Sequence, residues 1–214
     1  MARKLDILRR AELAAKAVQV LRARGVAGCT MSDLAGALGI KRPTLYFYFR
    51  DLGGVFDVVF EDTQRRYLEH VAGRIGGIAH PIEQLAALAR ATAEFHHGQR
   101  DLVVLLFQLW AVGGKDPERV VARGRELFEP TRQHMIARIA AGLAEGSVAP
   151  CDPARVVDLV QATLDGAMVA QVTRRTSPVP IIEEMVARVL DPLVLRPRVR
   201  AARAPANRPA RSTR

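Results

Sequence analysis

The segment Thr30–Phe49, which reads TMSDLAGALGIKRPTLYFYF, decides the fold because two short helical patterns meet there at Gly39-Ile40. The first pattern has a start signal in Thr30, followed three residues later by Asp33. A hydroxyl and a carboxylate at this spacing can satisfy the free N–H groups of an opening turn. Apolar residues then recur at helical spacing, at Leu34, Ala35 and Leu38. Two such patterns joined by a glycine turn predict a helix-turn-helix.

The second helical pattern begins near Arg42, with Pro43 in the first turn, where the missing N–H and fixed φ of proline suit a helix. Leu45 and Phe49, four residues apart, give this helix an apolar face. The other face combines cations, hydroxyls and aromatic rings, at Lys41, Arg42, Thr44, Tyr46, Phe47 and Tyr48. Because such groups suit phosphates and base edges, we interpret the helix as a DNA-recognition element.

The positive charge of the chain is gathered at its two ends. The net charge is +10 over 214 residues, with +7 on residues 1–50, −4 on residues 51–195 and +7 on residues 196–214. Charge concentrated on the segment that carries the helix-turn-helix favours a polyanionic partner, which we expect to be double-stranded DNA.

Cysteine content and the N-terminal residues bear on the compartment. Cys29 and Cys151 are far apart and have no second ligand at metal spacing, so we expect a reducing compartment, no metal and no cofactor. The start of the chain, MARKLDILRR, lacks the apolar run of a secretory signal. No stretch reaches the roughly 18 consecutive apolar residues of a membrane span. The expected location is the cytoplasm, on the nucleoid, with no membrane partner.

Helical periodicity dominates the chain and strand alternation is nearly absent, so the predicted fold class is all-α. We expect a first helix that ends at Gly25, and an apolar helix over residues 101–112 that belongs in a core. Further helices are predicted from near Gly53, from Pro81, from Asp116 to about Gly142 with Pro130 inside it, and from Cys151 to about Arg174. The last helix is expected to start at Pro178-Val179-Pro180 and to run from Ile181 to about Leu195. Residues 1–51 should form a head, residues 52–195 a helical body, and residues 196–214 a disordered tail rich in Arg, Pro and Ala.

The chain resembles the tetracycline-repressor (TetR) family of bacterial transcriptional regulators over residues 5–195. The specific part lies within residues 13–60, where the matching positions are Gly25, Thr30, Leu34-Ala35, Gly39-Ile40, Pro43-Thr44-Leu45-Tyr46 and Phe49. The resemblance implies a homodimer, a three-helix helix-turn-helix DNA-binding head and a C-terminal helical bundle, about nine helices in total. It also implies an effector pocket in the body, a fourth helix that transmits effector binding to the head, and pairing through the last two long helices.

By position, the resemblance assigns DNA contacts to one short stretch of the head. Arg42, Pro43 and Phe47 would face bases or the groove wall, whereas Thr44, Tyr46 and Tyr48 would hold phosphates. Further contacts to the backbone are expected from Ser32, Lys41 and Arg50. Lys41 stands where the family usually has a capping Ser, so the recognition helix loses a cap but gains a cation. The alternative for the aromatic residues Tyr46, Phe47 and Tyr48 is that they pack within the head.

For an effector pocket the sequence supports a candidate set of large or polarizable residues in an otherwise aliphatic body: Phe95, His96, Phe107, Trp110, Met135 and Met168. The alternative for each is ordinary core packing, and for His96 it is capping of carbonyls near a helix end. Few charged groups fall at core positions of the central helices, which favours a fairly apolar small-molecule effector.

Three classes of function follow from these observations. The leading one is a DNA-binding transcriptional regulator, a repressor released from a palindromic operator by its effector. The alternative is a DNA-binding protein that lacks a ligand, either architectural or regulated by a partner, whose body would have no cavity of the usual 300 to 1,000 Å³ or so. An enzyme is not expected, because the sequence contains no nucleophile elbow, phosphate loop or metal-spaced ligand set.

Overall fold

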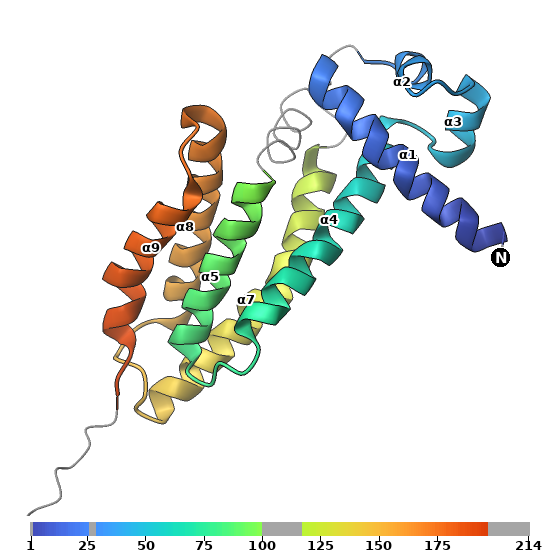
Figure 1. The fold of residues 1–214 in the computed structure, drawn as a ribbon. Coiled ribbons are helices and arrows are strands. Elements are labelled where there is room, and N and C mark those ends of the chain that lie inside the picture. Colours follow the sequence, from blue (N-terminus) through green and yellow to red (C-terminus); the bar gives the residue numbers. More distant parts are fainter. Residues whose placement is uncertain (1, 26–28, 100–116, 197–214) are drawn as a thin grey trace, which may run out of the picture.

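The computed structural model describes residues 2–25, 29–99 and 117–196, and their regular structure is helical (Figure 1). Across these ranges, β-structure is limited to one isolated antiparallel bridge between Val148 and Val194. The all-α prediction is therefore confirmed. The predicted apolar helix at 101–112 lies outside the described residues, and so does the predicted tail apart from Arg196.

Eight α-helices and two short helical turns follow one another in the described ranges. In chain order they are α1 (Ala2–Arg24), α2 (Met31–Ala37), α3 (Arg42–Tyr48), α4 (Leu52–Ile75), α5 (Pro81–Gly98), α7 (Pro117–Ala144), α8 (Pro153–Arg174), α9 (Pro178–Met185), the π-helical turn η1 (Val186–Leu190) and the 3-10 turn η2 (Asp191–Leu193).

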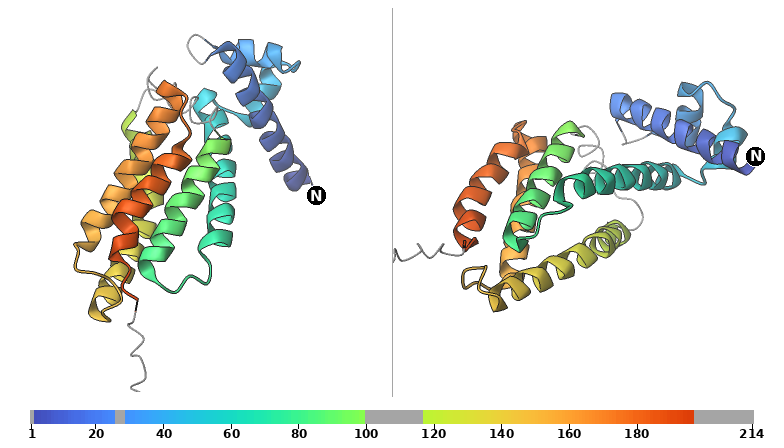
Figure 2. Two further views of the ribbon diagram at one scale, coloured as in Figure 1. Left: turned by 60° about the vertical axis from the view of Figure 1, so that its left-hand side comes forward. Right: turned by 60° about the horizontal axis from the view of Figure 1, so that its bottom comes forward.

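The head is built around its own apolar core. Its buried residues come from α1, α2, α3 and the start of α4, and include Leu13, Leu21, Leu34, Leu45 and Val55. As predicted, α1 ends just before Gly25, whose φ of +85° is strained for any residue with a side chain. The N-terminal half of α1 projects away from the other helices (Figure 2), and Ile7 and Leu8 are exposed there.

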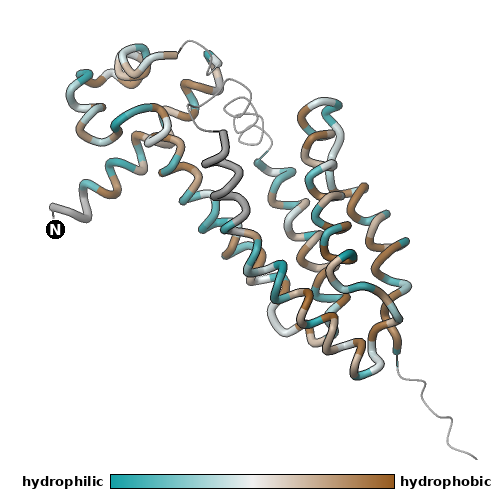
Figure 3. Tube along the Cα trace, turned by 180° about the vertical axis from the view of Figure 1, so that it is seen from behind, coloured by the Kyte–Doolittle hydropathy of each residue, from teal (hydrophilic) through white to brown (hydrophobic). Residues whose placement is uncertain are grey.

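The body has a second core, with α5 at its centre. This helix packs against α4, α7, α8 and α9. Its buried face contributes Ile82, Leu85 and Ala89, which meet Met135 and Ile139 of α7, Val160 and Leu164 of α8, and Ile182 of α9. Apolar and polar positions alternate along these helices (Figure 3), as expected where each helix buries one face.

The long helix α4 connects the head core to the body, where it packs along α5. It begins at Leu52, where Asp51 caps the first turn by accepting a hydrogen bond from the Gly54 N–H at 2.9 Å. Val55 lies in the head core, and the helix then runs along α5 into the body (Figure 2). A movement of α4 relative to α5 would therefore be carried directly to the head.

Several predicted helix starts agree with the structure. Pro81 opens α5, and Asp152 caps α8 by accepting hydrogen bonds from the N–H groups of Ala154 and Arg155. Pro130 lies inside α7. The last predicted helix begins at Pro178 behind the Ser177 cap, as the Pro178-Val179-Pro180 segment predicted. It does not continue as one regular helix to about Leu195, because it changes to π-helical and 3-10 turns after Met185. Within the described ranges, no helix combines the length and apolar character needed to cross a membrane.

Candidate DNA-binding helix and effector cavity

The first helix of the helix-turn-helix is held by a complete capping box. The Thr30 hydroxyl accepts a hydrogen bond from the Asp33 N–H at 3.2 Å, and the Asp33 carboxylate accepts one from the Thr30 N–H at 2.9 Å. Hydrogen bonds from the Thr30 side chain and backbone hold the pKa of Asp33 below its usual value. Met31, Leu34 and Ala35 are buried on the inner face, so α2 is fixed at its start and along its side.

The turn between the two helices depends on Gly39. Its φ is +65°, and its N–H donates to the carbonyl of Gly36 while the Ile40 N–H reaches the carbonyl of Ala35. A side chain at this position would be strained. The following residue, Lys41, occupies the N-cap of α3 without a side-chain hydrogen bond, as its replacement of a capping serine predicted.

Helix α3 divides into a buried and an exposed face within seven residues. Leu45 and the following Phe49 are fully buried in the head core, as predicted. On the opposite side the Arg42 guanidinium lies over the Tyr46 ring, 5.3 Å from its centroid, with 3.4 Å between Nη2 and the phenol oxygen. This cation and hydroxyl lie together on an exposed surface.

The predicted DNA-contact residues are exposed, with one partial exception. Phe47 is 74% exposed and Tyr46 is 42% exposed, so these two rings do not pack within the head. Tyr48 is half-buried against the head core, edge-on to Phe47 at 5.1 Å between centroids. The remaining predicted residues are all at the surface: Ser32, Lys41, Arg42, Pro43, Thr44 and Arg50.

A side chain outside this set also lies near the helix. Arg10 of α1 places its guanidinium 5.7 Å from the centroid of the Phe49 ring. The sequence does not predict this contact, because nothing in the spacing of Arg10 indicates which residue it meets across the head.

A cavity of about 130 Å³ lies in the body between α4, α5, α7 and α8. Its walls are mainly apolar and include Leu85, Leu88, Val157, Val160 and Leu164. The volume is below the usual range for drug-sized ligands, about 300 to 1,000 Å³, but is close to the roughly 150 Å³ of an engineered cavity that binds benzene. The described residues therefore border a space about the size of one ring.

Of the predicted effector residues, His96, Met135 and Met168 line this cavity. Phe95 is buried, but it is not among the described lining residues. It packs edge-on against Tyr67 at 5.5 Å between ring centroids. Phe107 and Trp110 lie outside the described residues.

The polar residues at the α4–α5 side of the cavity are Tyr67, Thr92 and His96. The Tyr67 hydroxyl lies 3.0 Å from Thr92 Oγ1, and the Tyr67 ring stacks on His96 with 6.0 Å between centroids. Burial raises the pKa of Tyr67 and lowers the pKa of His96 to about 4, so both side chains are neutral at pH 7. Sequence reasoning missed Tyr67 and Thr92, because helical spacing does not reveal that they border empty space.

The α7–α8 side of the cavity contains an arginine that is paired with two carboxylates. Arg132 donates from Nε and Nη2 to the two carboxylate oxygens of Asp158, at 2.7 and 3.1 Å, and its Nη1 lies 3.4 Å from Glu129. The hydrogen bond from Arg132 holds the pKa of Asp158 below its usual value. One guanidinium thus faces two carboxylates.

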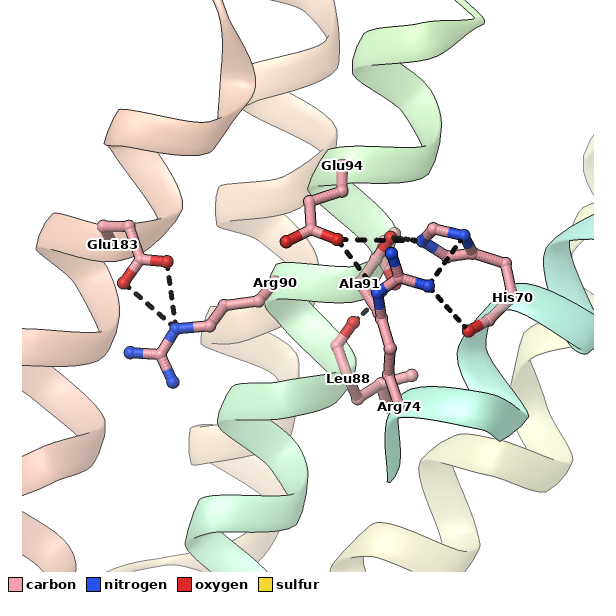
Figure 4. Close-up of polar contacts among 8 residues, drawn as sticks. His70, Arg74, Leu88, Arg90, Ala91, Glu94 and Glu183 are labelled. Carbon is pink, nitrogen blue, oxygen red and sulfur yellow. Dashed lines mark hydrogen bonds and ion pairs between the residues drawn. The ribbon is translucent and has the colours of Figure 1, made fainter. Parts of the chain in front are cut away.

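Beyond the cavity, polar contacts tie α4 and α9 to α5 (Figure 4). Arg74 donates to Glu94 at 3.0 Å and to His70 Nδ1 at 3.0 Å. Since an arginine can only donate, His70 carries its proton on Nε2 and donates to the Ala91 carbonyl at 3.1 Å. On the other side of α5, Arg90 Nε lies 3.0 Å from both carboxylate oxygens of Glu183.

A capped helix-turn-helix with an exposed basic and aromatic face, set on a helical body with a cavity, defines a DNA-binding regulator of the helix-turn-helix class. Residues 13–57 match the family described as "Bacterial regulatory proteins, tetR family". These residues span the helix-turn-helix head, so the predicted resemblance to the TetR family is confirmed for the DNA-binding part of the chain. Among curated proteins, none matches the chain.

Solved structures with the same fold cover nearly the whole molecule. A TetR transcription regulator from Haloarcula marismortui ATCC 43049 is 18% identical with a TM-score of 0.72, over 87% of this chain and 99% of that one. The ketosteroid transcriptional regulator KstR2 of Mycobacterium tuberculosis is 19% identical with a TM-score of 0.65, over 88% and 96%. AibR, in complex with isovaleryl coenzyme A and operator DNA, is 17% identical with a TM-score of 0.61, over 85% and 98%.

Proposed function

We propose that the protein is a homodimeric repressor that binds a pseudo-palindromic operator and is released by a small, mainly apolar molecule in the body cavity. The observation that carries this proposal is the exposed face of α3, where Arg42, Tyr46 and Phe47 project from a helix anchored by two buried residues. Two-fold symmetry of a dimer would require two-fold symmetry in its binding site.

The proposed division of labour follows the two cores. Residues 1–51 would bind DNA, residues 52–195 would bind the effector and form the dimer, and residues 196–214 would be a basic tail. Val55 extends the head core across the boundary at residue 52, which supports a transmitting role for α4. The proposal that the body binds an effector is supported by the structural similarity to AibR, which was solved in complex with both isovaleryl coenzyme A and operator DNA.

Exposed apolar side chains on the last two long helices support the proposed dimer. Leu159 and Val169 of α8 are 48% and 42% exposed, and Ile181 of α9 is 38% exposed. Pairing through α8 and α9 would remove these groups from water. We further propose that the protein acts on chromosomal DNA in the cytoplasm, on the nucleoid, and that it is a regulator without enzymatic activity.

The test begins with selection of bound DNA from a random pool by the purified full-length protein. The double variant Arg42→Ala/Tyr46→Ala should then bind the selected duplex at least about 100-fold more weakly, since each such contact contributes roughly 1–3 kcal/mol and both heads are altered. Arg65→Ala is the matched control, because it removes an exposed cation from the body part of α4, outside both the head and the proposed dimer helices. Unchanged affinity of a correctly folded double variant would refute the proposal.

A second candidate, a DNA-binding protein that lacks a ligand, is favoured by the small volume of the cavity relative to the usual range. Repeating the selection in the presence of a metabolite library separates the two. Release of the selected DNA by one compound supports the effector-controlled repressor, whereas indifference to the whole library supports the alternative.

A further inference from the structure

The hydrogen atoms at the polar side of the cavity can be assigned from the donors and acceptors present. Thr92 Oγ1 lies 2.8 Å from the carbonyl oxygen of Leu88, which can only accept, so the single hydroxyl proton of Thr92 is donated there. The 3.0 Å contact between Tyr67 and Thr92 must therefore use the Tyr67 proton. The phenol oxygen keeps a free lone pair and can accept a hydrogen bond from a molecule in the cavity.

The neighbouring His96 supplies the complementary group. Its backbone carbonyl accepts from Gln171 Nε2 at 3.2 Å, but its ring nitrogens have no hydrogen-bond partner among the described residues. Burial keeps the imidazole neutral, with its pKa near 4, so the ring presents one N–H and one lone pair. The half-buried His96 ring lines the cavity, so its N–H can donate to an acceptor on a molecule bound there.

The charged residues at the opposite wall oppose an anionic ligand. Glu129 and Arg132 are the charged residues among the described lining residues, and Arg132 is already shared between Glu129 and Asp158. No spare positive charge in this group is left to balance a carboxylate or a phosphate inside the cavity. Desolvation of a charged group without a partner is strongly unfavourable, so a neutral ligand is preferred.

We propose that the buried part of the effector is an uncharged, ring-sized apolar group that carries one hydroxyl, which accepts from the His96 N–H and donates to Tyr67 Oη. A hydroxyl is the simplest neutral group that makes both bonds at once. This inference rests on the proposed function only in taking the body cavity as the effector site. Because Tyr67 belongs to α4, a ligand bonded to it acts on the helix that reaches the head core.

The experiment compares three probes of matched shape, phenol, toluene and benzoate, by titration calorimetry with the full-length protein at pH 7.5. Phenol should bind roughly 2- to 12-fold more tightly than toluene, the range expected for a typical net hydrogen bond. Benzoate should bind more weakly than phenol, because the cavity offers it no counter-charge. Toluene binding as tightly as phenol, preference for benzoate, or no binding of phenol would each overturn the proposal.

Variants then identify the bonded groups. His96→Phe keeps a ring against Tyr67 and should reduce phenol binding to the level of toluene, while toluene binding stays the same and reports that the cavity is intact. Tyr67→Phe provides a second route to the same loss if the first variant does not fold. His97→Phe is the control, since His97 is exposed and does not line the cavity. Persistence of the phenol preference in both cavity variants would overturn the assignment.

Failure of this inference can be told apart from failure of the proposed function. Operator binding by Arg42→Ala/Tyr46→Ala is measured without any ligand and does not depend on the cavity. If that variant loses the operator while phenol shows no preference over toluene, the hydroxyl site is refuted and the repressor stands.

Discussion

The head and the body place their proposed binding groups in very different ways. In the head, a seven-residue helix holds both the buried anchor Leu45 and the exposed pair Arg42 and Tyr46, so one local pattern fixes fold and binding face together. In the body, the cavity draws Tyr67, His96, Met135 and Met168 from four separate helices. Local binding groups can be read from spacing, whereas those assembled from distant segments depend on how the helices pack.

The most direct test of this difference alters the two faces of α3 separately. It also has the largest expected effect on stability. Leu45→Ala should lower the free energy of unfolding by about 2–5 kcal/mol, because it empties a fully buried site in a small core. Phe47→Ala should change it by less than about 0.5 kcal/mol and instead weaken operator binding. Urea unfolding followed by circular dichroism measures the first quantity, and titration of the selected duplex the second. Comparable destabilisation by both substitutions would contradict the division of α3 into two faces.

The contrast explains what could be predicted from sequence. Thr30, Asp33, Gly39 and Pro43 act within a turn or two of themselves, and the helix starts and the turn that they predicted are present. The same holds for Pro81 at the start of α5.

The cavity could be predicted only in part, because its geometry depends on contacts far apart in sequence. Tyr67 and Thr92 are 25 residues apart, and their hydrogen bond depends on the register between α4 and α5, which no local pattern fixes. Phe95 illustrates the converse. It has the right chemistry and lies beside His96, yet it packs edge-on against Tyr67 and is not among the described residues that line the cavity. The size of a residue alone therefore does not distinguish a side chain that lines a cavity from one that fills the core.

The pH dependence of stability sharpens the description of the body. Since the pKa of His96 falls from 6.5 to about 4 on folding, the unfolded chain binds a proton between these values that the folded chain does not. Stability should therefore be intact above pH 6.5 and decline as the pH falls toward 4, by an amount on the order of 3 kcal/mol. Urea unfolding of the parent and of His96→Phe at pH 7.5 and 4.5 isolates this contribution from that of the carboxylates. His97→Gln serves as the control, and equal pH dependence in parent and His96→Phe would show that the imidazole is not held neutral.

The smallest expected effect concerns the two N-caps of the helix-turn-helix, which differ although they lie 11 residues apart on one motif. Thr30→Ala removes half of a formed capping box and should cost about 1 kcal/mol of stability. Lys41→Ser supplies the side-chain acceptor that α3 lacks and should add about 0.5–1 kcal/mol. Both values come from urea unfolding at a fixed salt concentration.

Lys41→Ser also separates stability from DNA affinity within a single residue. If the exposed Lys41 ammonium neutralises a phosphate in each head, the serine variant should be more stable yet bind the operator more weakly. Its slope of log affinity against log salt should be shallower by about 0.9 per lost contact. Lys41→Ala, which removes the charge without adding a cap, should share the shallower slope and lack the gain in stability. A steep slope retained by both variants would mean that the cap position of α3 carries no phosphate contact, and that the binding face begins at Arg42.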